Sequence, residues 1–252
     1  MTEFAAATED DRPVLKGCKV ESGEETLTMV GADGFRLAVK SVPVVAGETA
    51  DCIIPATTLR LLRSLLSVKG NTAELVWYRA DGDRKQMTVY SDTYLPGLTD
   101  LRITGQTIAG TFPNYQPLIP TTHTAVARML RSDLLSAVKE MAPIAAKGSG
   151  IVRMQLLADV EGADVEGARE AGAWLSTRAE EVGEYEQRVP VKMKDDVPGK
   201  IAFNLSYMLD LLNVLPGDVV VLGITEPSSP GVWWDGDDDT YTHVIMPTFV
   251  QW

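Results

Sequence analysis

An internal repeat of one strand and one helix constrains the fold of this sequence more than any other feature. Residues 52–66 and 201–215 each begin with a short apolar strand, continue through Pro55 or Asn204, and then place leucines at helical spacing. Proline and asparagine are both favoured where a helix starts. A strand-like segment follows each copy. Because the offset between the copies is roughly one domain, the sequence predicts two tandem domains of one α+β type.

The composition fits a folded two-domain protein of the cytoplasm. The chain has 252 residues, 45% of them hydrophobic, which is enough for two packed cores. No apolar run approaches the roughly 18 residues of a membrane-spanning helix, and the first residues lack the basic and apolar regions of a signal peptide. Cys18 and Cys52 lack metal-binding spacing, so we expect buried free thiols.

The net charge of −12 argues against a nucleic-acid partner if the charge is evenly spread. The stretch 55–70 departs from this average, since it contains Arg60, Arg63 and Lys69 and no acidic residue. At 100° per residue, Arg60 and Arg63 lie roughly opposite Leu62 on a helix. One face therefore packs on a sheet and the other is basic. A merely solvated helix face would show the same pattern, so charge alone leaves both interpretations open.

Local patterns predict the remaining elements. Residues 1–8 read as the end of a helix, Ser132 as the N-cap of a helix that Pro143 ends or kinks, and 185–193 as one strand. The proline-punctuated stretch 112–120 reads as a linker between domains, and 158–172 as a solvated loop insertion. Further strands are expected at 14–21, 26–30, 35–42, 73–78, 86–90, 101–108, 124–129, 151–157 and 174–177.

No pattern in the sequence points to catalysis. His123 and His243 are the only histidines, and neither has a nucleophile or carboxylate at a meaningful spacing. The acidic run 235–239 lacks the spacing of a calcium loop and reads as a polar turn. No glycine-rich phosphate loop is present. The sequence thus predicts a protein without catalytic residues, metal or cofactor.

Five segments carry a family resemblance. The Asp33-Gly34 pair suits a tight turn, and Phe-Arg-Leu-Ala-Val follows it with strand alternation. This hairpin, the preceding segment 8–17, the junction 112–120, the stretch 201–210 and the ending 243–248 come in the same order as in the bacterial sliding clamps. The chain resembles the second and third domains of that family, the DNA polymerase III beta subunits.

The resemblance implies a fold and a function. The expected fold is α+β, with tandem DNA-clamp domains that have antiparallel sheets outside and helices on the inner face. The middle clamp domain would span 1–120, with its opening helix cut short, and the C-terminal domain would span 121–252. The implied function is that of a processivity factor, which encircles duplex DNA and tethers the replicative polymerase without doing chemistry.

The resemblance also implies two sets of site residues. We call the first set the predicted pocket residues; they would form a hydrophobic cleft for polymerase and clamp-loader peptides and comprise Leu15, Ala32, Gly34, Phe35, Arg36, Leu37, Pro113, Pro117, Leu118, Ser229, Val244, Met246, Pro247 and Thr248. The second set would meet DNA phosphates without reading sequence and comprises Arg12, Arg60, Arg63, Lys69, Arg131, Lys139 and Lys147.

The expected partners are double-stranded DNA, the polymerase, the clamp loader and further copies of the chain, with no membrane. Six clamp domains close a ring. Three copies would supply them if two domains are the whole subunit, and two copies would do so if the chain belongs to a longer one. The alternative is a regulatory or peptide-binding module with the clamp fold that closes no ring. We expect a bacterial or phage protein associated with the nucleoid.

Overall fold

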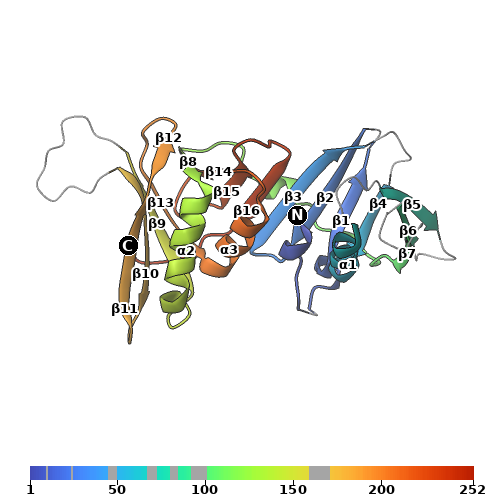
Figure 1. The fold of residues 1–252 in the computed structure, drawn as a ribbon, viewed down its shortest axis with the longest axis horizontal. Helices are drawn as coiled ribbons and strands as arrows, with labels where there is room; N and C mark the ends of the chain where they lie inside the picture. Colours follow the sequence, from blue (N-terminus) through green and yellow to red (C-terminus); the bar gives the residue numbers. More distant parts are fainter. Residues whose placement is uncertain are drawn as a thin grey trace, which may run out of the picture. The chain divides into compact units, whose positions relative to one another are not determined.

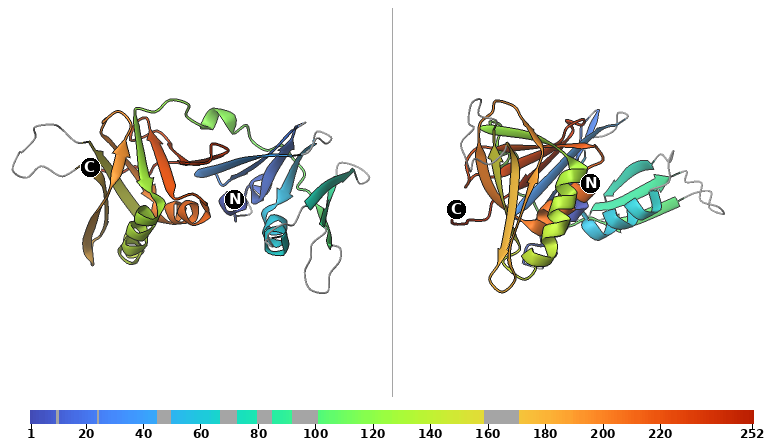
Figure 2. Two further views of the ribbon diagram at one scale, coloured as in Figure 1. Left: turned by 45° about the horizontal axis from the view of Figure 1, so that its top comes forward. Right: turned by 60° about the vertical axis from the view of Figure 1, so that its left-hand side comes forward.

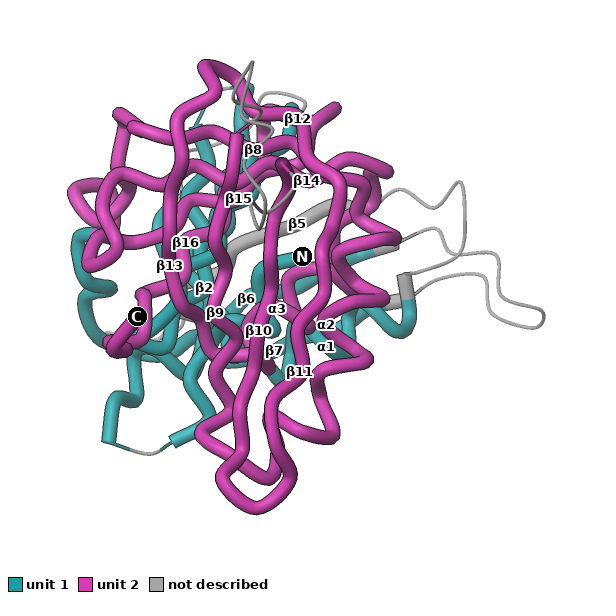
Figure 3. The backbone as a smooth tube through the Cα atoms, turned by 90° about the vertical axis from the view of Figure 1, so that its left-hand side faces the viewer, with its two compact units in different colours: residues 1–114 teal, residues 115–252 magenta. Residues whose placement is uncertain are grey.

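A computed structural model describes residues 1–9, 11–23, 25–44, 50–66, 73–79, 85–91, 101–158 and 171–252. The chain divides into two compact units, Met1–Asn114 and Tyr115–Trp252, which Figure 3 shows in different colours. The boundary between them falls inside the proline-punctuated stretch 112–120. Most of the predicted insertion 158–172 lies outside the described residues.

The described residues of unit 1 form two antiparallel sheets and one α-helix (Figure 1). The first sheet has the strand order β3-β2-β1-β4, and the second has the order β5-β6-β7. Helix α1 packs against β4 and β1. The elements are η1 (Glu3–Ala5), η2 (Pro13–Lys16), β1 (Gly17–Ser22), β2 (Thr26–Ala32), β3 (Arg36–Pro43), β4 (Ala50–Pro55), α1 (Ala56–Leu66), β5 (Ala73–Arg79), β6 (Lys85–Ser91) and β7 (Leu101–Gln106).

The core of unit 1 forms where the two sheets and α1 meet. Val20 from β1, Ile54 from β4, Leu62 from α1 and Met87 from β6 are buried in one cluster. Ile108, just after β7, also donates its backbone N–H to the Ile53 carbonyl at 2.8 Å, so the end of the second sheet is tied to β4. Both cysteines are buried and unbridged, as expected, and burial raises the pKa of Cys18 to about 11.

Unit 2 is also built from antiparallel strands and two helices. Its sheets have the orders β12-β8-β14-β15-β16 and β11-β10-β9-β13. Helices α2 and α3 pack side by side along one side of the strands, as the left view of Figure 2 shows. The elements are η3 (Gln116–Leu118), β8 (Ala125–Leu130), α2 (Arg131–Ala145), β9 (Ile151–Leu157), β10 (Gly172–Ala179), β11 (Gly183–Val189), β12 (Val191–Met193), β13 (Gly199–Asn204), α3 (Leu205–Val214), β14 (Val219–Ile224), β15 (Gly231–Asp235) and β16 (Tyr241–Ile245).

The structure confirms the predicted repeat and the α+β class. The copies at 52–66 and 201–215 are β4–α1 and β13–α3, each followed by a strand. In the second copy, the Asn204 side chain accepts a 2.9 Å hydrogen bond from the Ser206 backbone N–H, which caps α3 as the sequence predicts. The pairings within each unit are antiparallel. Among the described residues, no helix is both long and apolar enough to cross a bilayer.

The N-cap predicted at Ser132 is wrong, and so is an end of α2 at Pro143, whereas a kink at Pro143 stays a prediction. Ser132 does not cap the helix, because α2 already starts at Arg131, directly after β8. Pro143 lies inside the helix, which continues to Ala145. A proline removes one backbone donor and does not prevent the next turn, and the Ala146 N–H still bonds the Ala142 carbonyl at 2.9 Å.

The segment 185–193 is two strands instead of the single one predicted. Pro190 separates them, since it has no N–H for a sheet ladder. Strand β11 pairs with β10, while β12 pairs with β8 in the other sheet. Residues 1–8 contain only the short 3-10 turn η1, and residues 13–16, expected partly as strand, form another 3-10 turn before β1.

Phe203 provides a test of the unit 2 core. Its ring is fully buried, lies 5.4 Å from the Trp233 ring, and fills the space in which a side chain on Gly231 would stand. We expect Phe203→Ala to lower the free energy of unfolding by about 3–5 kcal/mol, because it leaves a large cavity. Phe249→Ala is the matched control, since Phe249 is 92% exposed and its loss should change stability by less than about 0.5 kcal/mol. Equal urea midpoints for the two variants would contradict this packing.

Candidate peptide-docking and DNA-facing surfaces

The β2–β3 turn is held rigid by Asp33. Its Oδ1 atom accepts hydrogen bonds from the backbone N–H groups of Phe35 and Arg36, at 2.8 and 2.9 Å. Its Oδ2 atom accepts from Arg36 Nε at 2.9 Å. Gly34 has φ +96°, and the Arg12 guanidinium occupies the position of any Cβ there. The turn therefore requires glycine, as the Asp-Gly pair predicts.

A second layer of contacts holds Arg36 in place. Its guanidinium donates to the Phe4 carbonyl at 3.0 Å and lies 5.4 Å from the centre of the Phe4 ring. Because Arg36 is held inward, the predicted pocket residue beside it, Phe35, projects from the turn and is 60% exposed. The other predicted pocket residues of unit 1 divide by burial: Leu15 and Leu37 are buried, Ala32 is half-buried, and Gly34 and Pro113 are exposed.

The predicted pocket residues of unit 2 lie on η3, in the connection between β14 and β15, on β16 and in the chain after it. Val244 is buried in β16, whereas Met246, just beyond the strand, is 44% exposed. The Thr248 N–H bonds the Ala202 carbonyl of β13 at 2.8 Å and so fixes the segment after Met246. Of the remainder, Pro117 and Leu118 are exposed, and Ser229, Pro247 and Thr248 are half-buried.

Exposed apolar side chains coincide in part with this set. Among the described residues, the large hydrophobic side chains with high exposure are Phe35, Leu61, Leu118, Leu130, Val182, Met246, Phe249 and Trp252. Three of them, Phe35, Leu118 and Met246, are predicted pocket residues. Exposed aromatic and flexible apolar side chains are typical anchoring points for a peptide. Each unit thus presents part of the chemistry that the predicted pocket needs.

The basic face of α1 exists but is partly neutralised. Arg60 and Arg63 are exposed and Leu62 is buried, in agreement with the helical pattern. Arg63 bonds the buried carboxylate of Glu3, and Arg60 donates to the Glu3 carbonyl at 3.4 Å. Burial would raise the pKa of Glu3, but the amino group of Met1 and Arg63 together hold it below its usual range. The sequence pattern of α1 gave no sign of this partner, which comes from η1.

Three other predicted DNA-facing residues differ in their surroundings. Arg12 is exposed, 3.8 Å from the Asp11 carboxylate. Lys69 lies outside the described residues. Arg131 donates from Nε to the Gly217 carbonyl at 2.7 Å and from Nη1 to the Leu212 carbonyl at 3.2 Å, so it joins the start of α2 to the end of α3. These bonds give Arg131 a structural role that the sequence prediction missed.

Lys139, within α2, and Lys147, beyond the end of that helix, are exposed. The neighbouring Glu140 accepts hydrogen bonds from the Ser136 hydroxyl at 3.1 Å and from the Tyr185 hydroxyl at 2.8 Å. Its carboxylate is therefore engaged by α2 and β11.

The acidic run 235–239 is a structural turn, as predicted. The buried Asp235 carboxylate accepts from the backbone N–H groups of Gly217 and Asp237, at 2.9 and 3.0 Å. The run joins β15 to β16. Within the described part of the chain, no three His, Cys, Asp or Glu side chains gather in a way that could hold a metal ion.

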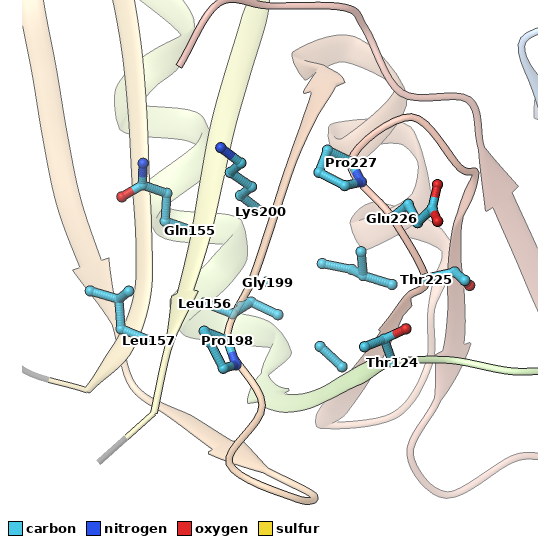
Figure 4. A pocket seen from close by; sticks show the side chains of 12 residues that line it. Thr124, Gln155, Leu156, Leu157, Pro198, Gly199, Lys200, Thr225, Glu226 and Pro227 are labelled. Atoms are coloured by element: carbon cyan, nitrogen blue, oxygen red, sulfur yellow. The ribbon is translucent and has the colours of Figure 1, made fainter. Parts of the chain in front are cut away.

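Unit 2 also contains a cavity of about 350 Å³ that sequence reasoning missed (Figure 4). Its walls come from the start of β8, the end of β9, the start of β13 and the chain after β14, which share no motif. The lining residues are Thr124, Ala125, Gln155, Leu156, Leu157, Pro198, Gly199, Lys200, Ile224, Thr225, Glu226 and Pro227. Most of this lining is apolar, and it lies within one unit.

His123 is half-buried and packs against an aromatic ring and a strand backbone. Its ring lies 5.5 Å from the Trp234 ring and covers Gly223, where a Cβ would stand 2.7 Å from the imidazole. Its Nδ1 atom is buried and has no hydrogen-bond partner among the described residues. Burial lowers the pKa of His123. This packing fits the absence of a catalytic pattern around the residue.

Comparison with known proteins decides the family. The sequence model described as the DNA polymerase III beta subunit, central domain, matches residues 1–114. The model of the C-terminal domain of the same subunit matches residues 116–249. The chain belongs to the DNA polymerase III beta subunit family. The two matches also follow the boundary between the two units of the structure.

Individual members of the family are similar over nearly the whole chain. The beta sliding clamp of Caulobacter vibrioides is 29% identical over 98% of this chain, and that of Synechocystis sp. is 24% identical over 97%. The chain spans about 60% of the length of these curated relatives. The crystal structure of the Bacillus subtilis DNA polymerase sliding clamp has a TM-score of 0.83 at 20% identity; the alignment covers 99% of this chain and 60% of that one. This similarity shows the fold.

The lowered pKa of His123 predicts a pH dependence of stability. As the pH falls, His123 in the unfolded chain takes up a proton near its ordinary pKa of 6.5, whereas in the folded protein it does so only at a lower pH. The contribution of neutral His123 is therefore complete above that pH, and stability falls as the pH drops through 6.5 towards the folded pKa. His123→Phe removes this titration and keeps an aromatic ring. We expect the urea midpoint of the wild type to fall more than that of the variant between pH 7.5 and 5.5. Equal falls of the urea midpoint in the wild type and in His123→Phe would refute this prediction. Both proteins retain His243, so its titration does not contribute to the difference between them.

Proposed function

We propose that this chain forms the central and C-terminal domains of a DNA sliding clamp, which encircles duplex DNA and tethers the replicative polymerase. The match of both family domains, in order, is the observation that carries the proposal. Such a protein needs no catalytic residues. It acts through topology and through the high effective concentration of a tethered partner.

In this proposal, DNA is held by few and weak phosphate contacts. Arg60 and Arg63 on α1 and Lys139 and Lys147 on and after α2 are exposed and suit that role. Glu3 moderates the charge of α1, and Arg131 is left out because its guanidinium bonds two carbonyls. Weak, sequence-independent contacts permit sliding, whereas base-specific contacts would arrest it.

Self-association into a ring belongs to the same proposal. In unit 2, β11 is the outermost strand of its sheet, and Glu184, Glu186 and Arg188 are exposed along it. An outer strand offers backbone groups that another chain can pair with. Two or three copies close the ring, according to the number of domains in the full subunit.

Retention on circular DNA tests whether the protein closes a ring. We expect the loaded protein to stay on a nicked plasmid and to be lost when the plasmid is cut to linear form. A protein that leaves both forms equally fast is a clamp-fold module without a ring, which would overturn the proposal.

The salt dependence of DNA binding tests the basic residues. We expect an Arg60→Ala, Arg63→Ala and Lys139→Ala triple variant to bind DNA with a slope of log affinity against log salt that is smaller by roughly 2–3. Lys192→Ala, an exposed lysine of β12 outside the predicted set, is the control.

Peptide binding tests the predicted pocket. We expect Met246→Ala to weaken binding of a fluorescein-labelled peptide from the polymerase about 5–30-fold, because an exposed anchoring side chain is lost from the cleft. Val182→Ala is the matched control, since Val182 is 54% exposed in the same unit and is not a predicted pocket residue. Fluorescence anisotropy measures both. Equal affinities would count against the pocket, and Leu37→Ala is a less direct test because that side chain is buried.

A further inference from the structure

The sheet β11-β10-β9-β13 of unit 2 has two different faces. Along β9, β10 and β11, less and more exposed residues alternate. The buried side chains, which include Met154 and Leu175, belong to the face on which α2 packs against β10 and β11. The alternate residues lie on the opposite face, and Figure 3 looks onto this sheet of unit 2. We call this opposite side of the four strands the open face.

The strand register places aromatic and cationic side chains of the open face in one row. Trp174 of β10 lies opposite Arg188 of β11 and opposite Gln155 of β9. Gln155 in turn pairs with Lys200 of β13. The Lys200 ammonium lies 5.3 Å from the centre of the Trp252 ring. The row therefore crosses all four strands in the order cation, indole, amide, cation, indole.

The side chains of this row can be reached from solvent. Arg188, Lys200 and Trp252 are exposed, and Trp174 and Gln155 are half-buried. Side chains on a strand stand roughly perpendicular to the sheet, so the members of the row project from the same side. Arg188 Nε also donates to the Ala171 carbonyl at 2.7 Å, which holds that side chain over the start of β10. Part of the row is thus ordered before any ligand binds, which lowers the entropic cost of binding.

The charge of the open face is opposite in sign to that of the whole chain. The chain has 23 Lys and Arg residues against 35 Asp and Glu residues. On the open face, Arg178 lies opposite Glu184, and their charges offset each other. The other charged residues of the face are Arg153, Arg188, Lys200 and Glu186. The face therefore has a positive excess and suits an anionic partner.

Cations interleaved with indole rings match the chemistry of a nucleic-acid single strand. Unpaired bases stack on aromatic side chains while Lys and Arg follow the phosphates. Some RNA-binding domains use a four-stranded sheet in this way, with two or three bases stacked on its aromatic residues. In a duplex the bases are stacked on one another, so their rings are not available to the indoles. An excess of cations alone would suit either form, whereas the indoles favour the single strand.

We propose that the open face binds single-stranded nucleic acid, with bases stacked on Trp174 and Trp252 and phosphates held by Arg153, Arg188 and Lys200. This site goes beyond the proposed function, which concerns duplex DNA and the helices. It also differs from the edge of β11, because the backbone groups of an edge strand point along the sheet and the row projects out of it. Bases and phosphates are common to DNA and RNA, so one probe of each distinguishes the two sources.

Binding of short oligonucleotides tests the indoles. The probes are fluorescein-labelled oligo(dT) and oligo(rU) of about 12 nucleotides, and fluorescence anisotropy at low salt gives their affinities. We expect Trp174→Ala to weaken single-strand binding at least fivefold and to leave the affinity for a duplex of the same length unchanged. Trp174→Phe keeps a ring and should restore most of the affinity. Val182→Ala is the control, since Val182 is an exposed apolar residue of the β10–β11 turn.

The salt dependence of oligo(dT) binding tests the cations. We expect Arg153→Ala combined with Lys200→Ala to make the slope of log affinity against log salt smaller by roughly 1.4, because two phosphate contacts to a single strand are lost. Lys192→Ala, an exposed lysine in the other sheet of unit 2, should leave the slope unchanged.

The triple variant Arg60→Ala, Arg63→Ala and Lys139→Ala separates this site from the proposed function. We expect it to keep full affinity for the single strand, and we expect Trp252→Ala to bind the single strand at least threefold more weakly. A wild type that binds neither probe, or unchanged affinities in both tryptophan-to-alanine variants, would refute the site. Single-strand binding lost only in the triple variant would move it to the helices and overturn the proposal. Failure to stay on circular DNA changes none of these results.

Discussion

The exchange of strands between the two halves of unit 2 is the constraint on which its other features depend. Helix α2 connects β8 to β9, and α3 connects β13 to β14, yet β9 pairs with β13 and β8 pairs with β14. Each half thus completes a sheet that the other half starts, so neither can bury its strands alone. This pairing puts the ends of β8, β9, β13 and β14 at one place, where the cavity forms. It also leaves one edge of β13 available to the Thr248 N–H.

The sequence predicted those features whose chemistry is local. The Asp33 side chain, the positive φ of Gly34 and the Asn204 cap all act within a few residues, and all three are as expected. Predictions failed where a distant partner decides. Ser132 would cap α2 only if the helix started at residue 133, but it starts directly after β8. The break at Pro190 matters because β12 joins a different sheet from β11.

The candidate sites divide in the same way. A helical projection identified the exposed Arg60 and Arg63, but it could not show that Glu3 accepts hydrogen bonds from both, because η1 and α1 are far apart in sequence. The sequence also could not show that Arg131 donates to the carbonyls of Leu212 and Gly217, because these residues lie at and after the end of α3, about 80 positions further along the chain. The cavity had no sequence signal at all, since each of its four walls contributes ordinary strand-end residues.

The Asp33–Arg36 pair shows why a pocket residue need not touch a partner to matter. Arg36 bonds both Asp33 and the Phe4 carbonyl, and so fixes the turn that carries Phe35. In unit 2 the Thr248 N–H restrains the segment after Met246 in a similar way. An exposed apolar side chain on a restrained backbone loses less conformational entropy when a peptide binds than one on a free loop. Rigid supports beneath exposed anchors therefore favour the docking of short peptides, which have few contacts with which to offset the cost of ordering both partners.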